Sequence, residues 1–75
     1  MYSFKRWLKL QINRHDPIGD LAVDASHAYE WNSSKARSCD ALEDILIARC
    51  ACTGAFEALD QAREEYQIYK NRARS

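Results

Sequence analysis

The stretch "RHDPIGDLAVD", residues 14–24, contains the only proline of the chain, Pro17, and one of its two glycines, Gly19. An aspartate before a proline is typical of a helix start. The carboxylate accepts a hydrogen bond from an unpaired backbone N–H, and proline needs no N–H at the first helical position. We therefore predict a helix that begins at Pro17 with Asp16 as its N-cap. Because glycine inside a helix costs roughly 1 kcal/mol relative to alanine, Gly19 predicts a closely packed neighbour.

The same stretch places three carboxylates, Asp16, Asp20 and Asp24, four residues apart. Such a set admits a metal-site interpretation, but hard cations usually take converging oxygen ligands from a flexible loop. A rigid helix with no further acid nearby serves that purpose poorly. The pattern favours a structural role, in which Asp16 caps the helix. Asp20 and Asp24 then lie on a solvated face or pair with the basic segment before them.

Apolar residues recur at helical spacing along the rest of the chain. Ser3 is the expected cap of a first helix that reaches about Asn13, with a basic face opposite its apolar face. The segment "YEWNSSKARS", residues 29–38, is predicted to be a loop. Ser38 is the expected cap of the next helix and Thr53 that of the last.

Period-two alternation is absent and β-branched residues are sparse, so we predict no strand. The expected fold is all-α: a compact orthogonal bundle of four to five short helices, forming one domain over residues 1–75. A chain of this length buries only ~60% of the surface that its unfolded form exposes. Its stability is expected at the low end of the usual range of ~5–15 kcal/mol.

The composition balances 11 basic against 11 acidic residues, whereas a dedicated duplex-DNA-binding domain normally shows a basic excess. The charges are unevenly placed: residues 1–14 carry four cations and no acid, and residues 15–31 carry four acids and no Lys or Arg. No secretory signal is apparent and no run approaches the ~20 apolar residues of a membrane span. We therefore expect a cytoplasmic protein without a membrane partner.

Three cysteines, Cys39, Cys50 and Cys52, are accompanied by two histidines, His15 and His27. Structural zinc sites usually show two ligand pairs, and here only a single Cys-x-Cys occurs. The pattern favours reduced, buried thiols over a disulfide or a metal site. No motif links a cysteine to a histidine and no glycine-rich phosphate loop is present. We predict no enzyme activity, no cofactor and no small-molecule substrate.

Several of these segments together resemble the YozE-like family of small bacterial proteins, whose fold is similar to the sterile alpha motif. The matching segments are "SFKRWL" (3–8), "RHDPIGDLAVD" (14–24), Trp31, the third helix with Leu42, Ile45 and Leu46, and "GAFEALDQAREEY" (54–66). The family pattern places an acid near Ala28 and a proline near Asn32, and this chain has neither. The resemblance implies a compact helical domain without established catalysis. Sterile-alpha-motif folds mediate protein association, and some bind RNA.

The basic face of the first helix is the first place to look for a binding surface. The candidate residues are Lys5, Arg6, Lys9, Arg14 and the aromatic Tyr69. The basic residues of the tail are expected to extend this surface, namely Lys70, Arg72 and Arg74. A plain solvated face is the alternative.

We therefore expect a small non-enzymatic interaction module that binds a protein partner or itself. Tyrosine and tryptophan are frequent at protein interfaces, and this chain has six of them. One alternative is nucleic-acid binding through the basic face of the first helix. Another is an inhibitor or accessory protein encoded by a phage or mobile element.

Overall fold

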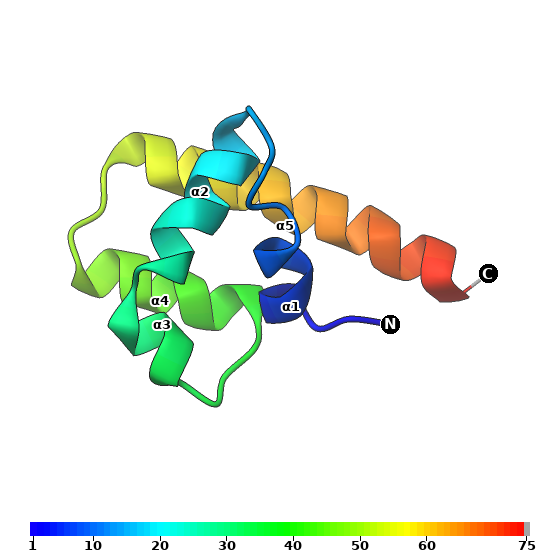
Figure 1. The fold of residues 1–75 in the computed structure, drawn as a ribbon, viewed down its shortest axis with the longest axis horizontal. Coiled ribbons are helices and arrows are strands. Elements are labelled where there is room, and N and C mark those ends of the chain that lie inside the picture. The colour runs from blue at the N-terminus through cyan, green and yellow to red at the C-terminus, as the bar shows by residue number, and fades with distance from the viewer. Residues whose placement is uncertain (75) are drawn as a thin grey trace.

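The structure, a computed structural model, describes residues 1–74, with the side chain of Arg74 excepted. Five helices and no strand occur in this part of the chain, which confirms the predicted all-α bundle (Figure 1). They are α1 (Phe4–Lys9), α2 (Pro17–Ser26), α3 (Tyr29–Ser33), α4 (Cys39–Ala48) and α5 (Thr53–Arg74).

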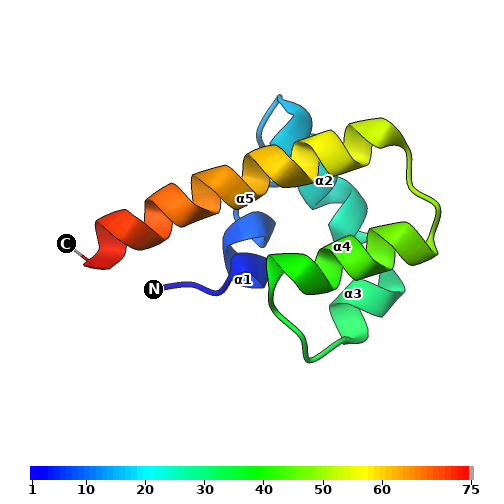
Figure 2. The same ribbon diagram turned by 180° about the vertical axis from the view of Figure 1, so that it is seen from behind.

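The long helix α5 packs against α2, α4 and α1, and its C-terminal part extends beyond the other helices (Figures 1 and 2). The short helices lie on one side of α5, and the N-terminal arm ends close to its extended part. All five helices contribute to one core. Its fully buried large side chains are Leu8, Ile18, Leu42 and Leu59.

Helix α2 begins as the sequence predicts. The Asp16 side chain accepts a hydrogen bond from the backbone N–H of Gly19 at 2.9 Å, and Pro17 is the first helical residue. A Cβ atom placed on Gly19 would collide with the backbone carbonyl of Arg14. The predicted close neighbour of Gly19 is therefore the turn that precedes its own helix.

Two predicted boundaries are wrong. The first helix ends at Lys9 rather than near Asn13. The N–H groups of Gln11 and Arg14 donate three residues back, which is the tighter spacing of turns, as the chain bends toward α2. The predicted loop at residues 29–38 contains helix α3, whose Trp31 is buried. Burial of this ring in the core outweighs the helix-breaking character of the residues that follow it.

The later helix starts are close to their predicted positions. Ser38 caps α4, since its hydroxyl oxygen accepts from the backbone N–H of Ala41 at 3.2 Å. Thr53 is the first residue of α5 rather than its cap. The N–H of Ala55 donates to the carbonyl of Cys52 at 3.0 Å, which places Thr53 inside the first turn.

The cysteines are not all buried, which corrects the sequence-based expectation. Cys50 and Cys52 are exposed because the connection between α4 and α5 runs over the surface, and only Cys39 is half-buried. All three thiols are free. Burial raises the pKa of the Cys39 thiol to about 11.

Cys50 occupies the left-handed conformation that closes the end of α4. Its φ is 53°, and it is the sole non-glycine residue with positive φ among residues 1–74. The N–H of Cys50 donates to Ile47 and that of Ala51 donates to Leu46, which is the bonding pattern of a Schellman motif. Glycine is the usual residue at this position because a side chain is unfavourable there.

We expect Cys50→Gly to stabilise the fold by about 0.5–1 kcal/mol, since relief of the left-handed strain exceeds the added entropy of the unfolded chain. Urea unfolding followed by circular dichroism measures this change. Cys50→Ala serves as the control, because it removes the thiol and keeps the strain. An equal gain in both variants would trace the effect to the thiol and contradict the conformational explanation.

Candidate binding site between the first and last helices

A shallow hollow of about 340 Å³ lies where α1 meets the C-terminal half of α5. We call it the terminal hollow, and it is lined by Trp7, Gln11, Glu65, Ile68, Tyr69 and Arg72. The two helices pack here through Phe4 and Trp7 of α1 against Tyr66 of α5. Ile68 lies on the flank of α5 that this packing leaves open and is 46% exposed. The hollow therefore combines a buried aromatic wall with an exposed aliphatic side chain.

Aromatic rings continue from the core to the edge of this hollow. The Trp7 and Tyr66 ring centroids are 5.7 Å apart, and those of Tyr66 and Tyr69 are 5.8 Å apart. Tyr2 then stacks on Tyr69 at 6.3 Å and is 45% exposed. The continuous contact fixes the outermost ring, so that Tyr2 presents a flat apolar surface to solvent at little entropic cost.

Two hydrogen bonds hold the N-terminal arm against α5. The backbone N–H of Tyr2 donates to the Tyr69 hydroxyl, and the Tyr66 hydroxyl donates to the Tyr2 carbonyl, both at 2.8 Å. Burial raises the pKa of Tyr66. The guanidinium of Arg6 lies 5.4 Å from the Tyr2 ring, and the ammonium of Lys70 lies 5.6 Å from the Tyr66 ring. Two cations therefore lie against this series of aromatic rings, one at Tyr2 and one at Tyr66.

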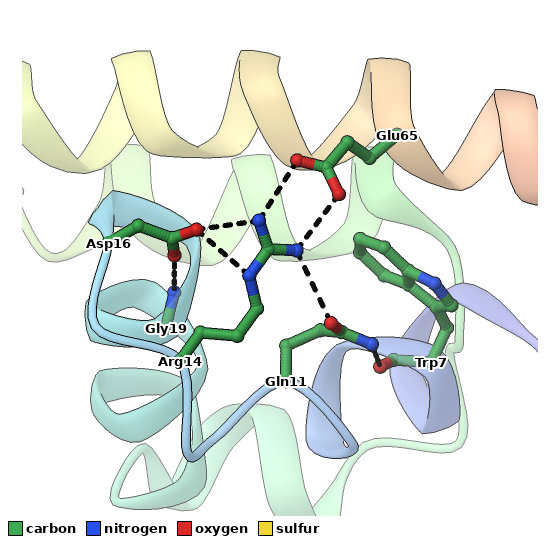
Figure 3. Close-up of polar contacts among 6 residues, drawn as sticks. All are labelled: Trp7, Gln11, Arg14, Asp16, Gly19 and Glu65. Carbon is green, nitrogen blue, oxygen red and sulfur yellow. Dashed lines mark hydrogen bonds and ion pairs between the residues drawn. The ribbon is translucent and has the colours of Figure 1, made fainter.

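Arg14 connects two residues that line the terminal hollow, Gln11 and Glu65, to the start of α2 (Figure 3). Its guanidinium donates to the Asp16 carboxylate at 2.6 and 2.9 Å and to the two Glu65 oxygens at 2.9 and 3.1 Å. It also donates to the Gln11 amide oxygen at 3.3 Å, while the Gln11 amide donates to the Trp7 carbonyl at 3.0 Å. The bonds from Glu65 and Asp16 raise the pKa of Arg14. Glu65 is thereby ion-paired with a cation that it shares with Asp16, and Gln11 is held in one orientation.

Asp16 joins this network to the start of α2. The Gly19 N–H, followed by Arg14, holds the pKa of the Asp16 carboxyl below its usual range. A carboxyl whose pKa falls on folding contributes stability above its unfolded pKa of ~3.9, and that contribution is lost as the pH falls through the folded value.

We expect Asp16→Asn to flatten the pH dependence of stability below about pH 4, because asparagine still caps the helix but does not titrate. At neutral pH the variant is less stable than the wild type, since the charged pair with Arg14 is lost. Urea midpoints at neutral and acidic pH measure both effects. Identical acid sensitivity in the two proteins would remove Asp16 as a source of acid unfolding.

The structure does not assemble the predicted basic residues into one patch. Arg6 and Tyr69 meet around Tyr2, as described above. Lys5 and Lys9 lie on another side of α1 and line a separate hollow against α2 and α3. Arg14 is engaged by Asp16 and Glu65, so it belongs to the packing between helices. Of the basic tail, Ser75 and the side chain of Arg74 lie outside the described residues.

Sequence reasoning missed the contributions of Tyr2 and Ile68. A signal for Ile68 exists, since it is an aliphatic residue that departs from the core spacing of Leu59, Ala62 and Tyr66 along the last helix. Apolar residues away from the core-facing side of a helix indicate a second contact surface. Tyr2 gave no comparable signal, because its position depends on α5, more than 60 residues away in the chain.

No group of three or more His, Cys, Asp or Glu side chains within residues 1–74 is arranged to hold a metal ion. Across the same residues, none of the helices combines the length and the apolar character needed to cross a membrane. The chain matches no protein-family model, no curated protein and no solved structure. The resemblance to the YozE-like family stays a prediction from the sequence.

Proposed function

We propose that this chain is a small non-enzymatic binding module whose binding surface is the terminal hollow together with Tyr2 and Arg6. The observation that carries the proposal is the open apolar flank of α5, where the half-exposed Ile68 adjoins a fixed series of aromatic rings. In a chain of 75 residues, apolar surface is scarce and is needed for the core. Rigid aromatic rings around a shallow hollow are typical of the central residues of protein interfaces.

The charges around the hollow indicate the chemistry of the partner. Arg6 and Lys70 contribute positive charge, and the one carboxylate that lines the hollow, Glu65, is ion-paired with Arg14, whose single charge it shares with Asp16. A complementary partner carries acidic residues around an apolar side chain that fits between Trp7 and Tyr69. An amphipathic helix or an extended acidic segment of another protein has this composition.

We expect Ile68→Glu to weaken binding of such a partner by about tenfold or more, because a carboxylate would be buried against apolar surface. The wild type, tagged at residue 75, captures the partner from its native cell, and isothermal titration with the purified partner gives the affinity. Ile47→Glu is the matched control: Ile47 is also an exposed helical isoleucine, at 59%, and lies on α4. Equal weakening by both variants would show that the terminal hollow is not the binding surface.

A charge reversal tests the second feature of the same surface. Arg6→Glu is expected to lower affinity for the acidic partner and reduce its salt dependence, whereas Lys35→Glu, in the exposed loop before α4, leaves both unchanged. Sedimentation of the protein alone identifies the case in which the partner is a second copy. In that case the mass rises with concentration, and Ile68→Glu abolishes the rise.

Nucleic-acid binding is the second candidate, favoured by the pairing of the Arg6 guanidinium with the exposed Tyr2 ring. An aromatic ring beside a cation is the arrangement that stacks on a base of a single strand and holds its phosphate. Fluorescence anisotropy with a labelled single-stranded oligonucleotide tests it. Binding that weakens with salt and is lost in Tyr2→Ala would favour this function over protein binding.

A further inference from the structure

A second hollow, of about 450 Å³, lies between α1, α2 and α3 on another side of α1 from the terminal hollow. We call it the lysine hollow. Its cationic side chains are Lys5 and Lys9, and its apolar walls include Leu8, Ala22, Ala25 and Trp31. Alanines on the α2 side leave the space that larger residues would fill. The volume falls in the ~300–1,000 Å³ range of small-molecule sites.

Lys5 is held in one position at the edge of this hollow. Its ammonium donates to the carbonyl of Trp31 at 2.5 Å and to that of Ser34 at 2.8 Å. The same ammonium lies 4.8 Å from the centre of the Trp31 ring. An ammonium has three N–H groups, so one remains after these two bonds. The charge is therefore fixed in advance, and a ligand would not have to order this side chain.

The hollow carries an uncompensated positive charge. Lys9 is one helical turn from Lys5 on the same side of α1 and is exposed. Neither lysine forms an ion pair within residues 1–74, and no residue that lines the hollow there is acidic. The nearby acid of α2, Asp24, lines a different hollow on the other side of that helix. Like charges at this spacing repel, and a bound anion would relieve the repulsion.

One amide adds to the donors around the hollow. The side-chain nitrogen of Asn32 donates one of its two N–H groups to the Ser26 carbonyl at 2.7 Å, which fixes the amide and leaves the other N–H available. Lys5, Lys9 and Asn32 thus surround the hollow with donors from two helices. Together with its apolar walls, this arrangement suits a molecule with an anionic end and an apolar body.

The geometry points to the lysine hollow as a binding site for a small organic anion, in which a carboxylate or phosphate group lies between Lys5 and Lys9 and a single apolar ring packs against Ala22, Ala25 and Leu8. This site is separate from the proposed protein-binding surface, and it stands or falls independently of that proposal. It gives a role to Lys5 and Lys9, the two candidate lysines that do not line the terminal hollow.

The test is a titration of the ¹⁵N-labelled full chain, followed by NMR, with phenyl phosphate and benzoate as probes. Saturable shifts are expected at the amides of Lys9, Ala25 and Asn32 and at the indole N–H of Trp31, with Trp7 unmoved. The tighter of the two probes identifies the preferred anionic group. Inorganic phosphate and benzyl alcohol, which carry the anion and the ring separately, are each expected to bind at least about tenfold more weakly.

Two charge reversals decide the assignment. Lys9→Glu is expected to weaken phenyl phosphate binding by about tenfold or more, because it places a carboxylate beside the anion. Lys35→Glu makes the same change of net charge in the exposed loop and is expected to leave binding within about twofold. Ile68→Glu is also expected to bind the probe normally, which separates this site from the terminal hollow.

Several results would overturn the proposal: no saturation by either probe, equal weakening by Lys9→Glu and Lys35→Glu, or shifts centred on the terminal hollow. Inorganic phosphate binding as tightly as phenyl phosphate would also overturn it, since the apolar walls would then contribute nothing. The spectrum of each variant shows directly whether it is folded, so a loss of binding cannot be confused with unfolding.

Discussion

Gly19→Ala is expected to destabilise the protein by about 2–3 kcal/mol, even though alanine is the better helix former. The added Cβ would lie 2.6 Å from the carbonyl carbon and 2.8 Å from the Cβ of Arg14, and closer still to the carbonyl oxygen. Two of these three atoms are backbone, so the turn before α2 must move to admit the methyl group. Such a shift would also displace the guanidinium that Asp16 and Glu65 hold, because Arg14 carries it.

Gly54→Ala is the matched control for this prediction. Gly54 also lies in a helix, but the nearest heavy atom to its added Cβ is the Cys52 sulfur at 3.9 Å, which is ordinary contact. Alanine there is expected to be neutral or to stabilise by up to about 1 kcal/mol. Urea unfolding of the two variants gives both values. A Gly19→Ala protein as stable as the wild type would mean that the turn at Arg14 adjusts freely.

Trp31→Ala is expected to cost about 3–5 kcal/mol, which is a large share of the stability of so small a domain. Trp31 is 3% exposed and is the buried residue of α3. Its helix packs against α2 and α4, and its ring lies beneath the Lys5 ammonium. The substitution therefore removes core volume and leaves α3 without the contact that holds it in place.

Tyr29→Ala changes an aromatic residue of the same helix that is 78% exposed, and it is expected to alter stability by no more than about 0.5 kcal/mol. Trp31→Phe, which keeps a ring in the core and loses part of its volume, should fall between the two. Chemical unfolding and the NMR amide signals of residues 29–33 separate loss of α3 from global unfolding. Comparable losses for Tyr29→Ala and Trp31→Ala would contradict the view that burial maintains this helix.

The accuracy of the sequence predictions depended on whether a helix start is determined locally. The Asp16–Pro17 start and the Ser38 cap were predicted correctly because a cap involves only a few adjacent residues. The end of α1 was missed because residues 10–13 contain no glycine or proline to mark the turn, and α3 was missed because it depends on contacts with distant parts of the chain. Trp31 is buried by other helices, and no local pattern in residues 29–38 reports that burial.

The candidate binding residues show the same difference between features determined locally and features that depend on distant contacts. The sequence indicated that residues 1–14 are basic, but it did not indicate that their cations point in different directions. Lys5 and Lys9 line one hollow, whereas Arg6 lies over Tyr2. Arg14 forms ion pairs with two carboxylates. Glu65 is 51 residues from Arg14, so the pair follows only from the way α5 crosses the bundle.

The sequence by itself determined that this chain is a helical bundle, where α2 and α4 begin, and that Gly19 lies against a close neighbour. Apolar spacing and helix capping involve residues that are close together in the chain, so both can be recognised before the fold is known. Only the tertiary structure decided which charges remain available and where the hollows form. Those properties depend on pairs of residues tens of positions apart, such as Tyr2 with Tyr69, whose contact exists only once the core has placed both helices.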